Sequence, residues 1–167
     1  MSSKRILRVI LILSLIFMNI GCDQVSKKIV RNSISDGEQI AVLKNNLILT
    51  RVENTGAAYS LGEGLHPWLK IIFLQLLPTV VLAILLVLVL VRRKYSKEIV
   101  LGFTFIIGGG IGNIFDRITQ GSVTDFLYID IGFFHTQIFN MADVSVVVGT
   151  LILVASALYK ERNLQLM

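Results

Sequence analysis

The sequence predicts an integral membrane protein that is mainly α-helical, a four-span helical bundle with a small β-sheet outside the membrane. Of its 167 residues, 54% are hydrophobic and only 16% are charged, which is more apolar surface than a soluble domain of this length needs. The apolar residues gather in four windows, at about 6–21, 69–91, 99–115 and 141–159. A chain of this length is enough for one domain, and we expect a single domain over residues 1–167.

The first and third windows are short for a membrane span. A hydrocarbon core is about 30 Å thick and needs about 20 helical residues. We therefore expect both helices to continue into the polar residues that follow them. The second window is almost featureless, and we interpret it as a scaffold helix.

The positions of lysine and arginine predict how the chain crosses the membrane. Basic residues gather before the first span, between the second and third, and after the fourth, at Lys4, Arg5, Arg8, Arg92, Arg93, Lys94, Lys97, Lys160 and Arg162. All lie on one side of a four-span chain, so by the positive-inside rule both termini are cytoplasmic. Residues 23–68 and 116–140 then face outward. These anchors account for the net charge of +5, so no nucleic-acid partner is expected.

The first span imitates a secretory signal, because a basic start and an apolar run lead to Gly21-Cys22. Three further spans follow it, so we interpret it as an uncleaved helix with an unlipidated Cys22. Asp23 and Lys27 stand four residues apart just beyond, with the acid first, which is the favourable order for a helical ion pair. That pair is either a helix-end salt bridge or part of a site with partners from elsewhere in the chain.

The segment after Asn32 changes to strand and turn chemistry. Residues 40–43 and 47–52 are rich in strand formers, and Asn45-Asn46 between them is typical of a hairpin turn. They predict a small sheet resting on the outer membrane surface. The small residues of 54–64 predict a loop with a short interfacial helix, in which Asn54 is either a turn residue or a site residue.

The third span carries a glycine pattern that predicts close helix packing. Gly108 and Gly112 form a GxxxG pair, and a second stripe follows at helical spacing through Gly102, Gly109, Asn113 and Asp116. Packing explains the glycines, but it does not explain the polar end of the stripe next to Arg117. An ionisable group at membrane depth is costly unless it is paired, hydrated or functional. We expect Asp116 to pair with its neighbour Arg117 and to support a site.

Four carboxylates face outward and compete for a catalytic role, Asp116, Asp125, Asp130 and Asp143. If residues 123–131 form a strand, alternation places Asp125 on its apolar face and Asp130 on the other. Asp143 begins the fourth span three residues after Asn140, a spacing that is also typical of a structural capping box. Two carboxyl groups within a few Å share one proton, so that one acts as base and the other as acid. The spacing alone does not show that Asp125 and Asp143 meet.

Other chemistries find little support in the sequence. Cys22 is the only cysteine, and the two histidines fit no zinc pattern, so we expect no metal and no cofactor. Two alternatives stay open: a small membrane transporter or proton-relay subunit, and a non-catalytic assembly factor. A relay predicts polar residues spread over several spans. An assembly factor would tolerate the loss of both Asp125 and Asp143.

Five motifs, in order, resemble the lipoprotein signal peptidase family, also called signal peptidase II: DQVSK at 23–27, NTGAAYS at 54–60, GNIFDR at 112–117, VTDF at 123–126 and FNMAD at 139–143. The resemblance covers nearly the whole chain. It implies an aspartic endopeptidase of the bacterial inner membrane, with its active site on the extracytoplasmic side. Such an enzyme removes signal peptides from diacylglyceryl-modified prolipoproteins just before the lipidated cysteine. The implied partners are prolipoproteins and membrane lipid, and we expect a monomer.

The resemblance also implies roles for individual residues. Asp125 in VTDF and Asp143 in FNMAD are similar to the family's catalytic pair. Its substrate-binding positions correspond to Asn54, Asn113, Arg117 and Asn140, and its supporting positions to Asp23, Lys27, Gly109 and Asp116. The family further implies that the sheet cradles the substrate and that the segment near Asn54 closes over the site.

Overall fold

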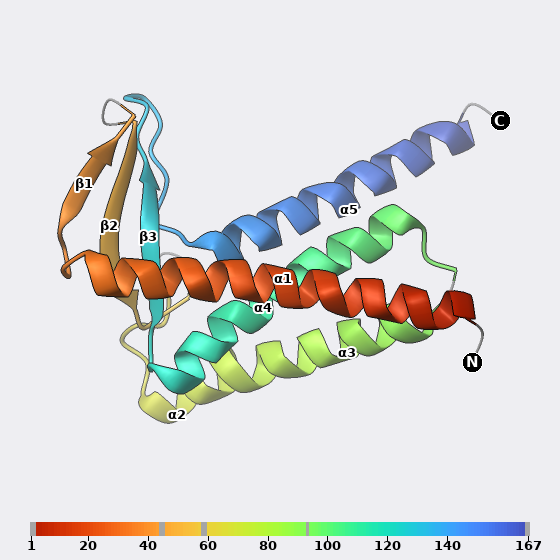
Figure 1. The fold of residues 1–167 in the computed structure, drawn as a ribbon, viewed down its shortest axis with the longest axis horizontal. Helices are drawn as coiled ribbons and strands as arrows, with labels where there is room; N and C mark the ends of the chain where they lie inside the picture. Colours follow the sequence, from red (N-terminus) through yellow and green to blue (C-terminus); the bar gives the residue numbers. More distant parts are fainter. Residues whose placement is uncertain (1–2, 44–45, 58–59, 93, 166–167) are drawn as a thin grey trace.

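The computed structural model describes residues 3–43, 46–57, 60–92 and 94–165. Its helices are α1 (Ser3–Ser33), α2 (Pro67–Lys70), the π-helical η2 (Ile71–Leu76), α3 (Leu77–Val91), α4 (Lys97–Thr119) and α5 (Met141–Gln165). Its strands are β1 (Gln39–Val42), β2 (Leu47–Asn54) and β3 (Val123–Ile129). Because α2, η2 and α3 follow one another without a break, the helices form four rods that run along the molecule (Figure 1).

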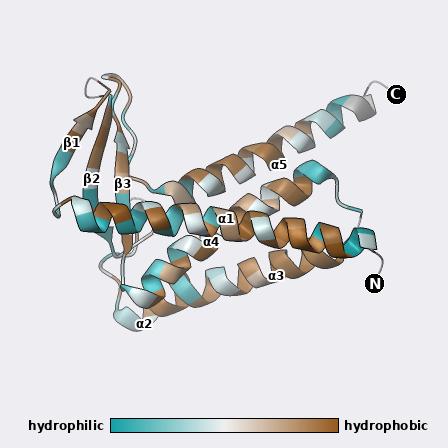
Figure 2. Cartoon of the chain, in the orientation of Figure 1, coloured by the Kyte–Doolittle hydropathy of each residue, from teal (hydrophilic) through white to brown (hydrophobic). Residues whose placement is uncertain are grey.

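The four rods confirm the predicted four-span fold. Within the described residues, four helices are long and apolar enough to cross a membrane: Ser3–Ser33, Pro67–Val91, Lys97–Thr119 and Met141–Arg162. The first and third continue well past their apolar windows, as the thickness of a bilayer requires. Figure 2 shows hydrophobic residues along most of each rod and hydrophilic ones toward the ends and near the sheet.

The sheet and the chain termini lie at opposite ends of the bundle (Figure 1). α1 and α4 run toward the sheet, whereas α3 and α5 run away from it. The basic start of α1, the link between α3 and α4 and the late turns of α5 therefore share the end that lies away from the sheet. This arrangement is the one that the positive-inside rule requires of a four-span chain.

The glycines of α4 let two neighbouring helices approach its backbone. A Cβ atom on Gly108 would lie 2.6 Å from a side-chain atom of α1, and one on Gly112 would lie 2.6 Å from Asp23 Oδ2. On the other stripe, a Cβ atom on Gly109 would collide with the carbonyl oxygen of Ala142 at the start of α5. The predicted glycine pattern is confirmed, since one stripe packs on α1 and the other on α5.

The three strands form one antiparallel sheet in the order β1-β2-β3. β2 pairs with β3 across a bulge between Leu49 and Val52, and the pairing ends with Asn54 opposite Val123. Phe126 of β3 is buried against Val30 in the last turns of α1 and Ile34 just after the helix, which fixes the sheet to the bundle. The end of β2 and the start of β3 are thereby held beside the helices.

The burial of β3 adds a detail that alternation alone did not predict. Alternation placed Asp125 on an apolar face and Asp130 on the other. In the structure Val123, Thr124, Asp125 and Phe126 are all buried. The Phe126 face packs on α1, and the Asp125 face lines a cavity, so both faces are covered.

Two other predicted features fall partly outside the described residues. The hairpin turn between β1 and β2 includes Lys44 and Asn45, which lie outside them. The short interfacial helix expected within 54–64 includes Ala58 and Tyr59, which also lie outside them. Both features stay predictions.

Candidate active site

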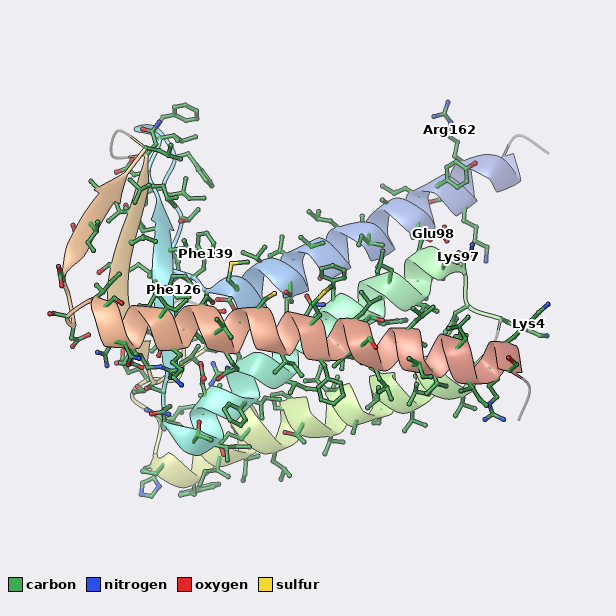
Figure 3. The ribbon with its side chains drawn as sticks, viewed as in Figure 1. Lys4, Lys97, Glu98, Phe126, Phe139 and Arg162 are labelled. Carbon is green, nitrogen blue, oxygen red and sulfur yellow. The ribbon has the colours of Figure 1, made fainter. Side chains whose placement is uncertain are left out.

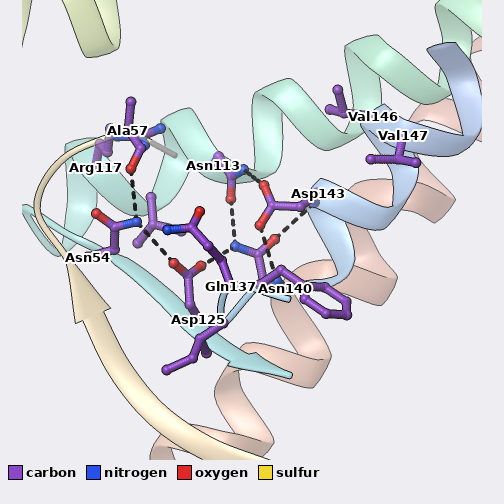
Figure 4. A pocket seen from close by; sticks show the side chains of 13 residues that line it. Asn54, Ala57, Asn113, Arg117, Asp125, Gln137, Asn140, Asp143, Val146 and Val147 are labelled. Carbon is purple, nitrogen blue, oxygen red and sulfur yellow. Dashed lines mark hydrogen bonds between the residues drawn. The ribbon is translucent and has the colours of Figure 1, made fainter. Parts of the chain in front are cut away.

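A cavity of about 410 Å³ lies where the sheet meets the bundle, between β3, α4 and the start of α5 (Figure 4). All six residues predicted for catalysis and substrate binding line it: Asn54, Asn113, Arg117, Asp125, Asn140 and Asp143. The sequence analysis did not foresee the rest of the lining, which is Ala57, Val123, Gln137, Ile138, Phe139, Val146 and Val147. Ala57, Val123 and Phe139 lie within the motifs at 54–60, 123–126 and 139–143, although no role was predicted for them, and the other four lie in no motif.

Asp125 is held by two amide groups in a buried position near the start of β3. Asn140 Nδ2 donates to its Oδ1 at 2.6 Å, and Asn54 Nδ2 donates to its Oδ2 at 3.1 Å. Only 5% of the residue is exposed. Burial raises the pKa of Asp125 to about 6; the hydrogen bonds from Asn54 and Asn140 oppose this rise, and the charge of Asp143 adds to it.

Asp143 is fixed at the first turn of α5 by a reciprocal cap. Its backbone N–H donates to Asn140 Oδ1 at 3.0 Å, and the Asn140 N–H donates to its Oδ2 at 3.1 Å. The predicted capping box is therefore present. The cap leaves Oδ1 of Asp143 to accept the Asn113 amide at 2.8 Å, and the residue still lines the cavity. The structural and the catalytic readings of this motif are thus compatible.

Asn140 links the two carboxyl groups. It is fully buried, and its side chain and backbone donate to Asp125 and Asp143 respectively. Figure 4 shows the two acids reaching the same cavity from different elements, with Asn140 between them. The fold therefore brings together the pair whose meeting the sequence spacing did not establish.

The orientation of the Asn113 amide is set by Lys27 of α1. Lys27 Nζ donates to Asn113 Oδ1 at 2.9 Å, and Asn140 Nδ2 donates to the same oxygen at 3.2 Å. An ammonium group has donors only, so the Asn113 oxygen must face it. The Asn113 Nδ2 group then points at Asp143, which accepts it.

Lys27 belongs to a buried charge cluster behind the cavity. Its Nζ lies 2.8 Å from Asp23 Oδ2 and 2.8 Å from Asp116 Oδ2, and all three side chains are fully buried. Asp23 also accepts the N–H of Ala142 at 2.9 Å, which ties the cluster to the start of α5. The predicted Asp23–Lys27 ion pair is confirmed, and its partners from α4 make it more than a helix-end salt bridge.

The predicted pairing of Asp116 with Arg117 is wrong. Asp116 faces α1, where it contacts Lys27 and lies 3.8 Å from Arg31 Nη2, because neighbouring residues of a helix point in different directions. Sequence analysis also missed Gln24, which donates to Asp116 Oδ1 at 3.0 Å and to Asp23 Oδ2 at 3.1 Å. The sequence did contain a signal for this contact, because the polar residues at the end of α1 recur three and four residues apart, as residues on one face of a helix do.

Arg117 and Asn54 hold the loop that follows β2. Arg117 Nη2 donates to the Gly56 carbonyl oxygen at 2.8 Å, and Asn54 Oδ1 accepts the Gly56 N–H at 2.9 Å. Asn54 Nδ2 also donates to the Ala57 carbonyl oxygen at 3.2 Å. Arg117 lines the cavity, and within the described residues its buried Nε has no hydrogen-bond partner.

The fold and the cavity define a multi-span membrane protein with a buried polar site at one end of its helical bundle. Within the part of the chain that the structure describes, no cluster of His, Cys, Asp and Glu could hold a metal ion. A sequence model of the family described as signal peptidase (SPase) II matches residues 15–159. The chain belongs to this family and is accordingly a peptidase, and membership supports cleavage of prolipoprotein signal peptides.

Individual proteins agree with the family match. The chain is 38% identical to a lipoprotein signal peptidase of Enterococcus faecalis over 132 residues, which cover 79% of this chain and 78% of that protein. It is 34% identical to a lipoprotein signal peptidase of Listeria monocytogenes over 144 residues, covering 86% and 90%. A solved structure described as a bacterial membrane enzyme superposes with a TM-score of 0.80 at 25% identity, covering 91% of this chain and 90% of that one.

Proposed function

We propose that the chain is an aspartic endopeptidase in which Asp125 and Asp143 form one catalytic unit. One observation carries the proposal: both carboxyl groups face one cavity and share Asn140, which donates to each of them. Different surroundings separate the protonation of two neighbouring acids and so divide acid and base roles between them. The raised pKa of Asp125, about 6, supports Asp125 as the group that holds the shared proton.

In this mechanism Asp143 is the base and Asp125 is the acid. Asp143 accepts a proton from water as the water oxygen attacks the scissile carbonyl carbon, and Asp125 gives its proton to the carbonyl oxygen. The resulting gem-diol collapses when Asp143 passes its proton to the leaving nitrogen and Asp125 takes back a hydroxyl proton. The C–N bond breaks, and both carboxyl groups return to their starting states.

Arg117, Asn54, Asn113 and Asn140 are proposed to bind substrate and to hold the acids. Arg117 lines the cavity, and its planar fork suits a peptide carbonyl group that enters there. The Asn54 side chain hydrogen-bonds both to Asp125 and to the Gly56 N–H in the loop after β2. Closure of that loop over a substrate would therefore change the hydrogen bonding of Asp125. Asp23, Lys27, Asp116 and Gly109 are proposed to support this arrangement from behind.

The proposed substrates are diacylglyceryl-modified prolipoproteins, cleaved just before the lipidated cysteine. Family membership supports this class, and so does the position of the cavity. Its wall includes Val147, which is 57% exposed on a helix apolar enough to span the membrane. A signal peptide and its acyl chains would therefore reach the acids from the lipid, without passing through water.

We propose that the cavity faces the extracytoplasmic side of the bacterial inner membrane. The start of α1, the link between α3 and α4 and the late turns of α5, which carry the three basic clusters, lie at the other end of the bundle, and this supports the orientation. Reporter fusions near Asp36 and Gln120 should read extracytoplasmic, and a C-terminal fusion should read cytoplasmic; an outward C-terminus would contradict the proposal. We further propose a monomer without a nucleic-acid partner.

The transporter alternative has less support. A buried hydrophobic cluster extends along α1, α3 and α4 through Ile12, Ile16, Leu82, Val89, Ile107 and Ile114. The buried polar residues beside it, Asn19, Thr104 and Ser145, cannot ionise at neutral pH. A proton relay across the membrane needs ionisable or hydrated groups along its path. The ionisable cluster instead stays at the end that carries the sheet, as a hydrolytic site at one membrane surface requires.

Cleavage of a lipidated precursor tests the proposal. The purified full chain should cut a diacylglyceryl-modified precursor and leave its unlipidated form intact. Asp125→Asn and Asp143→Asn should each abolish turnover while the protein stays folded and still binds a non-cleavable lipopeptide. Because the two acids act as a unit, the double variant should be scarcely worse than either single one.

Matched controls distinguish chemistry from charge. Asp36→Asn and Asp130→Asn remove carboxylates that do not line the cavity, so both should stay active. Arg117→Lys keeps the positive charge without the planar fork and should lose most activity in folded protein. Substantial turnover by folded Asp125→Asn or Asp143→Asn would rule out the dyad and reopen the transporter and assembly-factor readings.

A further inference from the structure

A second hollow lies at the end of the bundle that carries the chain termini, away from the proposed dyad. It measures about 390 Å³ and runs between the first turns of α1 and the first turns of α4. Its floor is aliphatic and includes Leu7, Leu11 and Leu15 of α1, with Leu101 of α4. Its other lining includes cations from both helices.

The cations gather at one end of this groove. Lys4 and Arg8 come from the first turns of α1, and Lys97 is the first residue of α4. Figure 3 shows Lys4 and Lys97 at the end of the bundle, with Arg162 farther out on α5. A cation in the first turn of a helix adds to the positive end of the helix dipole, which is unfavourable unless an anion lies nearby.

The first turn of α1 holds no acidic residue, and Glu98, which follows Lys97 in the first turn of α4, forms no ion pair with it among the described residues. Arg8 is committed to the end of α3, since its Nη2 donates to the carbonyl oxygens of Val89 and Arg92 at 3.0 and 3.1 Å. Lys4 and Lys97 are exposed, and neither makes an ion pair or hydrogen bond in the part of the chain described. The lining of the groove contains no acidic residue. Two ammonium groups are therefore available for a ligand.

Tyr95 places these ammonium groups at the level of lipid headgroups. It lines the groove and packs on Phe103 with ring centroids 6.1 Å apart. Tyrosine is enriched where hydrocarbon meets water, so the lysines lie at that boundary and the leucines lie below it. At a rise of 1.5 Å per residue, Lys4 and Leu15 stand about 16 Å apart, close to the depth of one leaflet, about 15 Å.

We propose that this groove binds one phospholipid with an anionic headgroup. The headgroup phosphate lies between Lys4 and Lys97, and one acyl chain follows the leucines between α1 and α4. Charge complementarity selects this occupant, because a zwitterionic lipid balances its phosphate with its own ammonium group and an anionic lipid leaves a net charge for the two cations. A soluble anion would not occupy the aliphatic floor. Basic pockets between membrane helices bind anionic headgroups by the same physics.

Lipid binding to the purified full chain tests the proposal. Native mass spectrometry in neutral detergent should show tighter binding of phosphatidylglycerol than of phosphatidylcholine. Each cation near a headgroup contributes about fivefold in affinity, so Lys4→Gln with Lys97→Gln should weaken phosphatidylglycerol binding about 25-fold. The matched control is Lys160→Gln with Arg162→Gln, which removes the same charge at the same end of the bundle but outside the groove.

Further arms test the acyl slot and the specificity. Leu11→Trp should fill the groove and weaken binding with every cation in place, and glycerol phosphate should not compete with the phospholipid. Equal binding of the two lipids, equal loss in the control pair, or undiminished binding by Leu11→Trp would each overturn the proposal. If the double variant fails to fold, Lys97→Gln alone should show the fivefold loss, and its absence would count against the site.

Discussion

Replacing Lys27 by methionine tests how the buried charge cluster supports the proposed dyad. Methionine keeps the length and apolar stem of the side chain but removes the ammonium group, which contacts Asp23, Asp116 and Asn113 at 2.8, 2.8 and 2.9 Å. Breaking a buried ion pair typically costs about 3–5 kcal/mol, because it leaves charge without compensation. Asp23 keeps the Ala142 N–H and Asp116 keeps Gln24, so we expect the lower end, about 3 kcal/mol.

The same substitution should reduce activity through Asn113. Without the ammonium group, the amide loses the donor that sets its orientation and can present its oxygen to Asp143. A misplacement of about 1 Å in a catalytic group can cost about 100-fold in rate, and we expect a loss of this order in precursor cleavage. Unfolding in mixed micelles and single-turnover cleavage would measure the two effects separately.

Lys28→Met is the matched control, because Lys28 is exposed on the next position of the same helix. It should leave stability and turnover nearly unchanged. Adding Asp116→Leu to Lys27→Met removes one stranded carboxylate and should recover part of the stability but none of the activity. Lys27→Met that is as stable and as active as Lys28→Met would refute the reasoning.

Two further predictions concern the acid and the helix contact. Burial raises the pKa of Asp125 to about 6, so the protonated carboxyl group contributes to the free energy of unfolding at a pH below the pKa of the unfolded chain, and this contribution is lost as the pH rises through 6. Thermal unfolding measured from pH 4 to 7.5 should therefore show the wild type losing stability relative to Asp125→Asn. Gly109→Ala should cost about 1–3 kcal/mol and most activity, since its Cβ meets the Ala142 carbonyl oxygen. Gly21→Ala, with open space around it, is the control, and equal stability and turnover of the two alanine variants would contradict the packing argument.

Hydropathy and spacing were sufficient to predict the bundle. An apolar run of about 20 residues has few alternatives to a membrane helix, and the glycine stripes of α4 follow directly from helical geometry. The Asp23–Lys27 pair was predictable for the same reason, because both residues lie on one helix four positions apart. Local periodicity therefore carries most of the information about α1 and α4.

Contacts between elements were not predictable in this way. The bulge between Leu49 and Val52 sets which residues of β3 pair with which residues of β2. The two strands lie far apart in the sequence, so no tight turn between them predicts this register. The choice of Lys27 over Arg117 as the partner of Asp116 also depends on how α1 lies against α4. Resemblance to a known family identified the site residues, whereas geometry identified their partners.

The two acids of the proposed dyad differ because different elements carry them. Asp125 comes from a strand that is covered on both faces, so burial dominates its environment and raises its pKa. Asp143 comes from a helix start, where it accepts the Asn140 N–H and the Asn113 amide beside the positive end of a helix dipole. Joining a strand to a helix start through Asn140 gives two carboxyl groups at one cavity with unlike surroundings, which is what general acid–base hydrolysis requires.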